Sequence, residues 1–450
     1  MESVPCLNYC LAIIRSISMK AALPLAVGVA LASVTVVVAE IPYPQTLEEL
    51  NTWYVESPTG SNAATYYLKA FDALKITDAD PKALNLPLIG KSQLPSPEKR
   101  LPAAMAVAVG AFVERNKSAF PLLAQGANFA QSRYPMDFTK HPYIPLPHLG
   151  NIKLSAEVLE LYGISKALTG RGDLAGESVL TGLALGRSLE AEPLYISQQV
   201  RVSCTVVTVE NLEQALNRVL LPPDTLDQLY DCLSQYAESE AKGIGFTRAT
   251  VAERILAQAN FDVLPERQVE IMMTIEPKPR YTNTLQLLEK NRSADLNFIK
   301  NTFDEVLASR QQDFSQRLVV NRIFERRAAE AVNKEFVISA FELNGTTNVA
   351  SREARSLTYL RLGQTAVALE RYRAFHDNQY PDSLLQLTPT YLQSIPEDPF
   401  DGQPLRFRRT ANGYILYSVG YDLDDDSGRR GKWSDGDLVF SVLNPPTRRQ

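Results

Sequence analysis

The sequence predicts a mainly α-helical protein, built as a helical-hairpin array, that ends in a small α+β domain. Apolar residues recur at three- and four-residue spacing over most of the chain, as on the buried face of amphipathic helices. From 351 to 444 the chain instead combines one helix, a proline-punctuated loop and short runs typical of strands. With 450 residues, 45% of them hydrophobic and 22% charged, the chain has the composition of a globular protein of two or three domains.

Charge and metal-ligating residue types exclude two classes of partner. The formal net charge is −5, whereas a nucleic-acid binder needs a basic face to neutralise phosphates. The three histidines and four cysteines do not have the spacing of a zinc site. We therefore expect neither a nucleic-acid partner nor zinc.

The first 39 residues have the features of an export segment. Residues 21–39 (AALPLAVGVALASVTVVVA) carry no charge, follow Lys20 and end in small residues of the kind that signal peptidase requires. The same run is near the lower length limit for a helix that spans a bilayer. We expect a cleaved signal peptide, with a retained membrane anchor as the alternative, and Met19 is an alternative start. Either outcome places the protein in the periplasm or cell envelope.

The region 40–147 is expected to be helical, with proline-rich connectors. Helical stretches between 47 and 131 are separated by one connector, 81–102. A second irregular passage, 134–147 (YPMDFTKHPYIPLP), contains four prolines, which exclude a regular helix. Its aromatic residues either lie across a groove or cover the core, and we favour the second interpretation.

The region 148–345 is predicted to form helical hairpins. Four apolar residues between Leu154 and Leu168 share one helical face, and Thr169-Gly170-Arg171-Gly172 then ends the helix. Asp173 is placed to cap the next helix. On that helix, Gly182 and Gly186 would let the first helix approach closely. This is the arrangement of one unit of a helical-repeat array, although no fixed sequence period is present.

Residues 200–209 (VRVSCTVVTV) alternate as a strand does, but no turn residue interrupts the chain between Leu194 and Leu221. We therefore predict a helix, and Pro222-Pro223 starts the next one. In such a hairpin, Cys204 lies about 27 Å and Cys232 about 14 Å from the turn, at 1.5 Å of rise per residue. We expect no disulfide between these two cysteines.

Two long helical stretches are expected next, 283–308 and 311–343. The second is amphipathic and rich in charged residues. Asn344-Gly345-Thr346-Thr347-Asn348 ends it, and this run is the best candidate for a domain boundary.

The last region begins with a helix from near Ser351 to His376, where a histidine suits the negative end of the helix dipole. Tyr380-Pro381, Asp398-Pro399-Phe400 and 413–422 (GYILYSVGYD) follow in a specific order. This order resembles the globular domain of the major pseudopilin of type II secretion systems. The resemblance implies a small antiparallel sheet behind the helix. In that family an apolar stalk helix continues into the domain, whereas here the apolar segment lies far upstream, as expected of a domain reused as a module.

The resemblance also implies a calcium ion held by Asp422 and by Asp435 or Asp437. From the residues alone, Asp422, Asp424 and Asp426 alternate, and calcium prefers six to eight oxygen ligands. The candidate calcium ligands are Asp422, Asp424, Asp426, Asp435 and Asp437. The alternative is a solvated acidic turn balanced by nearby basic residues, because Trp433 stands where an EF-hand loop has its bidentate glutamate.

No catalytic motif is present in the sequence: it contains no G-x-S-x-G, H-E-x-x-H or C-x-x-C pattern. We therefore expect an exported, non-enzymatic envelope protein with protein partners, whose pseudopilin-like domain at 351–444 serves interaction or assembly related to type II secretion. The alternative is an exported hydrolase on a helical scaffold, with the C-terminal domain as an accessory module, because a catalytic carboxylate pair can be distant in sequence.

Overall fold

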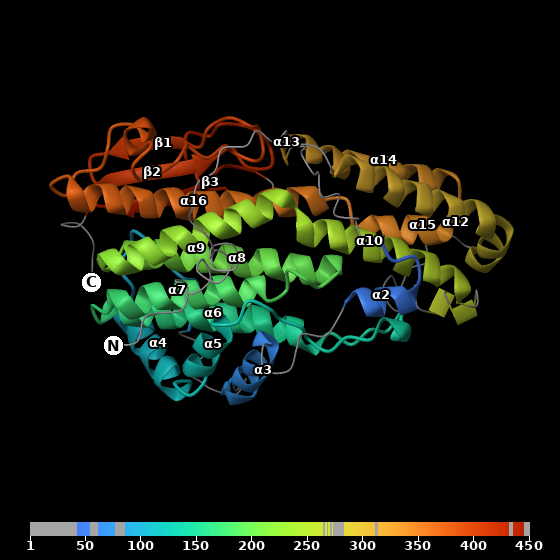
Figure 1. Cartoon of the computed structure of the whole chain (residues 1–450), viewed down its shortest axis with the longest axis horizontal. Coiled ribbons are helices and arrows are strands. Elements are labelled where there is room, and N and C mark those ends of the chain that lie inside the picture. The colour runs from blue at the N-terminus through green and yellow to red at the C-terminus, as the bar shows by residue number, and fades with distance from the viewer. Residues whose placement is uncertain are drawn as a thin grey trace, which may run out of the picture.

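The protein is mainly helical, with a three-stranded antiparallel sheet near its C-terminus, which confirms the predicted class at this level (Figure 1). The computed structural model describes residues 43–54, 62–76, 86–263, 266–267, 269–270, 272, 283–310, 314–431 and 435–444. The predicted export segment, 21–39, lies outside these residues. Among the helices of the described ranges, none combines the length and apolar character needed to cross a membrane.

Short helices and irregular segments form the N-terminal part. The helices are α2 (Leu47–Trp53), α3 (Ala63–Ala73), α4 (Ala103–Arg115), α5 (Phe120–Ala127) and the 3-10 turn η2 (Phe138–Lys140). The proline-rich passage 134–147 covers the core, as predicted. Tyr134 and Phe138 in it are almost completely buried, and Phe138 packs with Leu50 of α2 and Val251.

Long helices then run side by side through the centre of the molecule (Figure 1). They are α6 (Pro147–Leu168), α7 (Gly172–Arg187), α8 (Tyr195–Leu216) and α9 (Pro223–Lys242). The prediction of a helix over 200–209 is confirmed, because α8 is continuous there. Cys204 and Cys232 are both buried, each in a different core cluster.

Two local predictions for α7 are wrong. Asp173 lies in the first turn rather than at the cap, and its carboxylate accepts two hydrogen bonds from Arg171, at 2.9 and 2.6 Å. The small residues face α8 instead of α6. A Cβ at Gly182 would lie 2.6 Å from Thr208 Oγ1, and one at Gly186 would lie 3.2 Å from Cys204 Cβ. The glycines therefore allow close approach of the following helix.

The next region also differs from the prediction. It contains α10 (Ile244–Ala259), η3 (Asn260–Asp262), α12 (Thr284–Ser309), α13 (Phe314–Arg317), α14 (Val319–Asn333), α15 (Val337–Glu342) and η4 (Leu343–Gly345). The prediction of one helical stretch over 311–343 is wrong. The chain turns at Glu335, whose φ is +58°, and Asp295 of α12 accepts from the amides of Ile338 and Ser339. This distant carboxylate caps α15 and so favours a new helix start.

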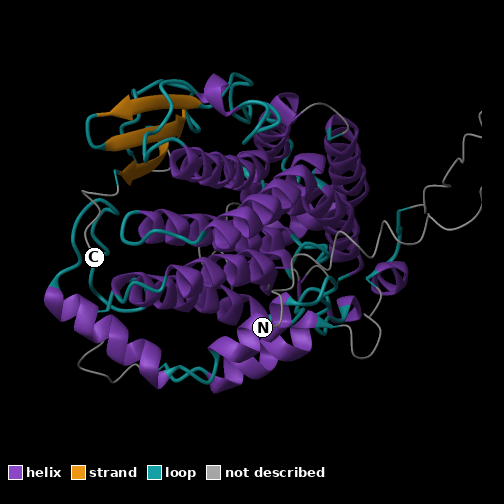
Figure 2. Cartoon of the chain, turned by 60° about the vertical axis from the view of Figure 1, so that its left-hand side comes forward, coloured by secondary structure: helices purple, strands orange, loops and turns teal. Residues whose placement is uncertain are grey.

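The C-terminal part begins with α16 (Val349–Phe375), which packs on α8 and α9. After η5 (Leu384–Leu387), the strands β1 (Arg406–Thr410), β2 (Gly413–Ser418) and β3 (Leu438–Leu443) form the sheet in that order. The sheet lies beside one end of the helical body (Figure 2). A single core cluster includes Leu233 of α9, Leu369 of α16 and Phe440 of β3. The hydrophobic core therefore continues from the central helices into the sheet.

Candidate functional site

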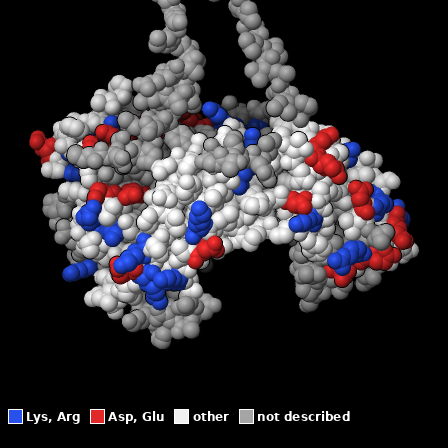
Figure 3. Space-filling model, turned by 60° about the horizontal axis from the view of Figure 1, so that its bottom comes forward, with Lys and Arg blue, Asp and Glu red and all other residues white. Residues whose placement is uncertain are grey.

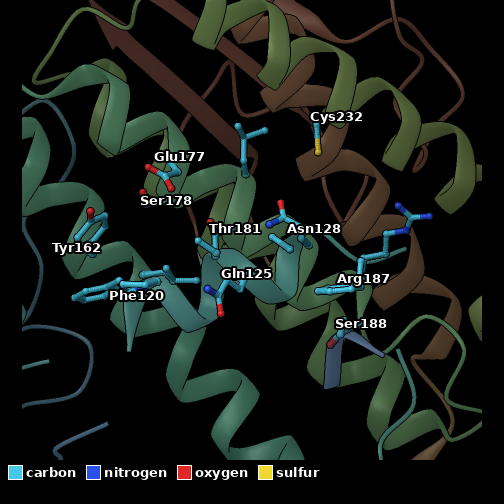
Figure 4. Close-up of a pocket in the computed structure, with 18 of the residues that line it drawn as sticks. Phe120, Gln125, Asn128, Tyr162, Glu177, Ser178, Thr181, Arg187, Ser188 and Cys232 are labelled. Atoms are coloured by element: carbon cyan, nitrogen blue, oxygen red, sulfur yellow. The ribbon is translucent and has the colours of Figure 1, made fainter. Parts of the chain in front are cut away.

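A cavity of about 580 Å³ lies between α5, α7 and α9, with the end of α6 closing one side. Figure 4 shows Phe120 and Tyr162 at one end of it and Arg187 and Ser188 toward the other. On the underside of the molecule, charged side chains gather at two ends, and the surface between them is mostly uncharged and hollowed (Figure 3). The cavity volume is in the range of small-molecule sites, which is roughly 300–1,000 Å³.

Helix α7 supplies part of the cavity wall, with Glu177 and Arg187 and with small or apolar residues between them. Leu180, Thr181 and Ala184 follow one another along this face. Opposite them, α5 contributes Phe120 and α9 contributes Cys232. Where a large side chain on α7 would fill the space between α5 and α9, the small residues leave it open.

Two of the serine hydroxyls that line the cavity are engaged within the protein. Ser178 Oγ donates to the carbonyl of Ala175 at 2.7 Å and accepts from Asn211 Nδ2 at 2.9 Å. Ser188 Oγ donates to the carbonyl of Leu185 at 2.6 Å and lies 3.0 Å from the hydroxyl of Tyr134. These groups therefore need no hydrogen bond from a ligand.

Charges of both signs stand around the cavity. Desolvation raises the pKa of the carboxyl groups of Glu177, on α7, and Asp231, on α9. The guanidinium of Arg187 lies 5.2 Å from the ring centre of Tyr236. The Lys166 ammonium lies 5.0 Å from the ring centre of the tyrosine at the opposite end, Tyr162. Both contacts have the geometry of cation–π pairs.

The acidic loop of the C-terminal domain uses two of its candidate calcium ligands to bind its own backbone. Asp437 is buried, and its carboxylate accepts from the amides of Gly428 at 2.6 Å and Asp426 at 3.4 Å. Burial raises the pKa of Asp437. Asp422 accepts from the amides of Gly436 at 2.8 Å and Asp424 at 3.2 Å. These bonds join the two ends of the loop.

The remaining candidate ligands are spread along the same loop. Asp426 is paired with Arg429 at 2.7 Å, Asp424 is exposed, and Asp435 directly precedes the glycine whose amide Asp422 binds. Trp433 lies outside the described residues. Within the ranges given above, no group of three aspartate, glutamate, histidine or cysteine side chains is arranged to hold a metal ion. In this arrangement the carboxylates stabilise the loop themselves.

Each of the three histidines either packs against other side chains or caps a helix. His148 Nε2 lies 2.8 Å from Glu192 Oε1, and its ring stacks on Tyr134. His141 Nε2 contacts Asn260 at 2.9 Å, and burial lowers its pKa. His376 directly follows α16, and its Nδ1 lies 2.7 Å from a main-chain carbonyl of the last turn. This is the capping position that the sequence predicts for His376.

Asp398, which the sequence reading did not single out as a functional residue, organises the C-terminal domain. It is completely buried and accepts from Ser418 Oγ at 2.8 Å, from the amide of Val419 at 3.0 Å and from Arg406 at 2.8 Å. The Asp-Pro-Phe run that carries the family resemblance therefore ties a turn to the end of β2. In the sequence, the only signal for this structural role of Asp398 is its position in the Asp-Pro-Phe run.

No family model, curated protein or solved structure matches this chain. The likeness of 351–444 to a pseudopilin head therefore stays a hypothesis from the sequence. The function has to be inferred from the geometry of the cavity and of the C-terminal domain.

Proposed function

We propose that this protein is an exported, non-enzymatic envelope protein in which a helical-hairpin array carries a pseudopilin-like domain, 351–444. In this proposal the domain binds protein partners in an assembly related to type II secretion. Export rests on the charge-free segment 21–39 with its small terminal residues. The binding role rests mainly on which edge of the sheet contacts the helical body and which edge does not.

The sheet is attached to the helical body through β3, and this leaves the outer edge of β1 facing away from the body. Side chains of α8 bind the outer edge of β3, while β1 is the other outer strand of the sheet. Thr410 and Gly413 close a tight hairpin, so the peptide groups of Phe407 and Arg409 point away from β2. An outer strand of this kind can pair with an extended segment of a partner. This placement of β1 is the observation that carries the proposal.

Site-specific photo-crosslinking in cells tests the binding role. A photoreactive residue replaces Arg408, which is exposed on β1, or Val107, which is exposed on α4. We expect the β1 position to crosslink to one defined envelope protein and the α4 position not to do so. Equal crosslinking from both positions, or none from either, would contradict the proposed role of β1.

Export is tested separately with alkaline phosphatase fused after Asn444, because this enzyme becomes active only outside the cytoplasm. We expect the fusion to be active, and a fusion that lacks residues 1–39 to be inactive. Activity that does not depend on residues 1–39 would contradict the assignment of this segment.

One observation favours the alternative, an exported hydrolase. Glu177 and Asp231 both line the cavity, as Tyr162 and Tyr236 do, and desolvation raises the pKa of both carboxyl groups. Two carboxyl groups, one of them an acid with a raised pKa, are the usual catalytic groups of glycoside hydrolysis. If this alternative holds, the protein cleaves chromogenic glycosides, and Glu177→Gln and Asp231→Asn each abolish the cleavage. An inactive wild-type protein removes this candidate.

A further inference from the structure

The cavity between α5, α7 and α9 has the features of a site for a hydrocarbon chain. Its apolar lining includes Val113, Phe120, Leu159, Leu180 and Ala184. The cavity measures about 580 Å³, and burying a methylene group stabilises a complex by about 0.8 kcal/mol. A chain inserted along this wall would therefore be held by apolar burial.

Two of the polar groups that line the cavity do not need a hydrogen-bonding ligand. Ser178 and Ser188 are buried, and both hydroxyls already have partners within the protein. A sugar or nucleotide placed against them would lose its hydrogen bonds to water without gaining a partner from either hydroxyl. The part of the ligand that enters the cavity is accordingly apolar.

The rim, by contrast, suits a polar head group. Gln125 and Asn128 are exposed at the end of α5. Arg187 stands toward one end of the cavity, and Lys166 lies beside Tyr162, which is at the other end (Figure 4). Glu177 and Asp231 add negative charge to the same rim, so it does not favour one sign of head group strongly. The ligand is thus an amphiphile recognised by its chain.

We propose that this cavity binds the acyl chain of a single-chain amphiphile, with the head group at the rim. None of the described residues of 351–444 lines the cavity, so the proposal does not rest on the protein-binding role of the C-terminal domain. A negative result for acyl-chain binding would therefore not contradict the protein-binding role, and a negative result for protein binding would not contradict the acyl-chain site.

The test uses the full chain and displacement of the fluorescent apolar probe N-phenyl-1-naphthylamine by octanoate, decanoate and dodecanoate. We expect saturable binding at one site, with the affinity rising about 15-fold for each two methylenes, as 0.8 kcal/mol per methylene requires. A decyl glucoside in place of decanoate should bind within about tenfold, because the chain provides most of the affinity.

Two variants locate the site. Ala184→Trp places an indole in the deeper cavity, and Gln125→Trp places one at the exposed rim, where it does not disturb the core. Ala374→Trp, at an exposed position near the end of α16, is the matched control. We expect the first two variants to weaken displacement at least tenfold and the control to match the wild type. Absence of saturable binding, or equal binding by Gln125→Trp and the control, would overturn the proposal.

Discussion

The side-chain amide of Asn217, the residue that caps the C-terminal end of α8, donates a hydrogen bond to the main-chain carbonyl of Ser441, on β3, at 2.8 Å. The amide oxygen of Asn217 accepts from the main-chain amide of Leu443 at 3.0 Å, so this side chain pairs with β3 as a neighbouring strand would. One turn earlier, Glu213 accepts from the amide of Ser441 at 2.6 Å and pairs with Arg430. Burial raises the pKa of Glu213 to about 7. Side chains of α8 therefore fix the sheet to the helical body.

The first prediction concerns this junction. Asn217→Ala leaves a carbonyl and an amide of β3 without their partner, so we expect the free energy of unfolding to fall by about 1–3 kcal/mol. Urea denaturation of the full chain measures the change. The matched control is Asn151→Ala, at an exposed position of α6, which should be nearly neutral. Equal effects of the two substitutions would contradict the role given to Asn217.

The second prediction compares two glycines. Gly243 joins α9 to α10 with φ +67°, and a Cβ there would lie 2.5 Å from Arg317 Nη1 and 2.6 Å from Glu353 Oε1. Gly243→Ala should therefore destabilise the protein by more than about 1 kcal/mol. Gly150→Ala, in α6 with open space around it, should be neutral or stabilising by about 0.5–1 kcal/mol. Thermal unfolding of both variants checks the opposite signs.

The third prediction concerns a buried ion cluster. Both carboxylate oxygens of Glu353 accept from Arg310, at 2.8 and 2.9 Å, and Arg317 lies 3.5 Å away. Glu353→Gln leaves buried guanidinium charge without its counter-ion, which costs about 3–5 kcal/mol. Asp382→Asn removes an exposed partner of Arg409 and should barely shift the urea midpoint. A similarly small shift for Glu353→Gln would show that the cluster is hydrated.

The fourth prediction is a dependence of stability on pH. Burial raises the pKa of Glu253 to about 7 and that of Glu342 to about 8, from an ordinary value of 4.5. Between pH 4.5 and 8 the folded state therefore binds more protons than the unfolded state, so these groups stabilise the protein below pH 4.5 and lose that contribution as the pH rises to 8. The loss for one group is at most about 1.4 kcal/mol per pH unit.

Glu342→Gln tests this dependence, because glutamine cannot titrate and its amide oxygen can still accept from Asn260. We expect the unfolding free energy of the variant to fall less steeply between pH 5.5 and 8.5 than that of the wild type. Parallel curves for the two proteins would show that Glu342 does not carry the raised pKa.

The fifth prediction is calcium binding by the acidic loop. Calcium should raise the unfolding temperature of the full chain, and at a concentration of 100 times its Kd it would add about 2.7 kcal/mol. Asp424→Asn should remove most of the increase, while leaving the backbone contacts of Asp422 and Asp437 in place. Magnesium is the control ion. An unfolding temperature unchanged by calcium would end this hypothesis.

The helices that the sequence predicted well are those with local signals. The Thr-Gly-Arg-Gly break before α7 and the double proline at the start of α9 lie next to the residues they organise. The break between α14 and α15 could not be predicted in this way. It depends on a cap by Asp295, which approaches Ile338 only in the folded protein.

The candidate cavity and the buried charges could not be predicted from the sequence, because they too depend on segments that meet only in the folded protein. Glu353 lies four residues from the apolar Val349 and Leu357, on the buried face of α16, but its partner Arg310, at the end of α12, reaches it only in the folded protein. Likewise, the cavity forms because α5 and α9 meet the same face of α7, although they lie far apart in the chain. The short strand-like runs that predicted a sheet are local signals, and β1 and β2 form a hairpin of adjacent segments, whereas β3 follows β2 only after residues 419–437.

Hydrogen exchange tests most directly the central claim that the C-terminal sheet and the helical body form one folded unit. The amides to compare are those of Ser441 and Leu443, on β3, and that of Val209, inside α8. We predict that all three exchange with similar, slow rates, and that Asn217→Ala accelerates only the two on β3. Exchange of the β3 amides that is orders of magnitude faster than that of Val209 in the wild type would contradict this claim.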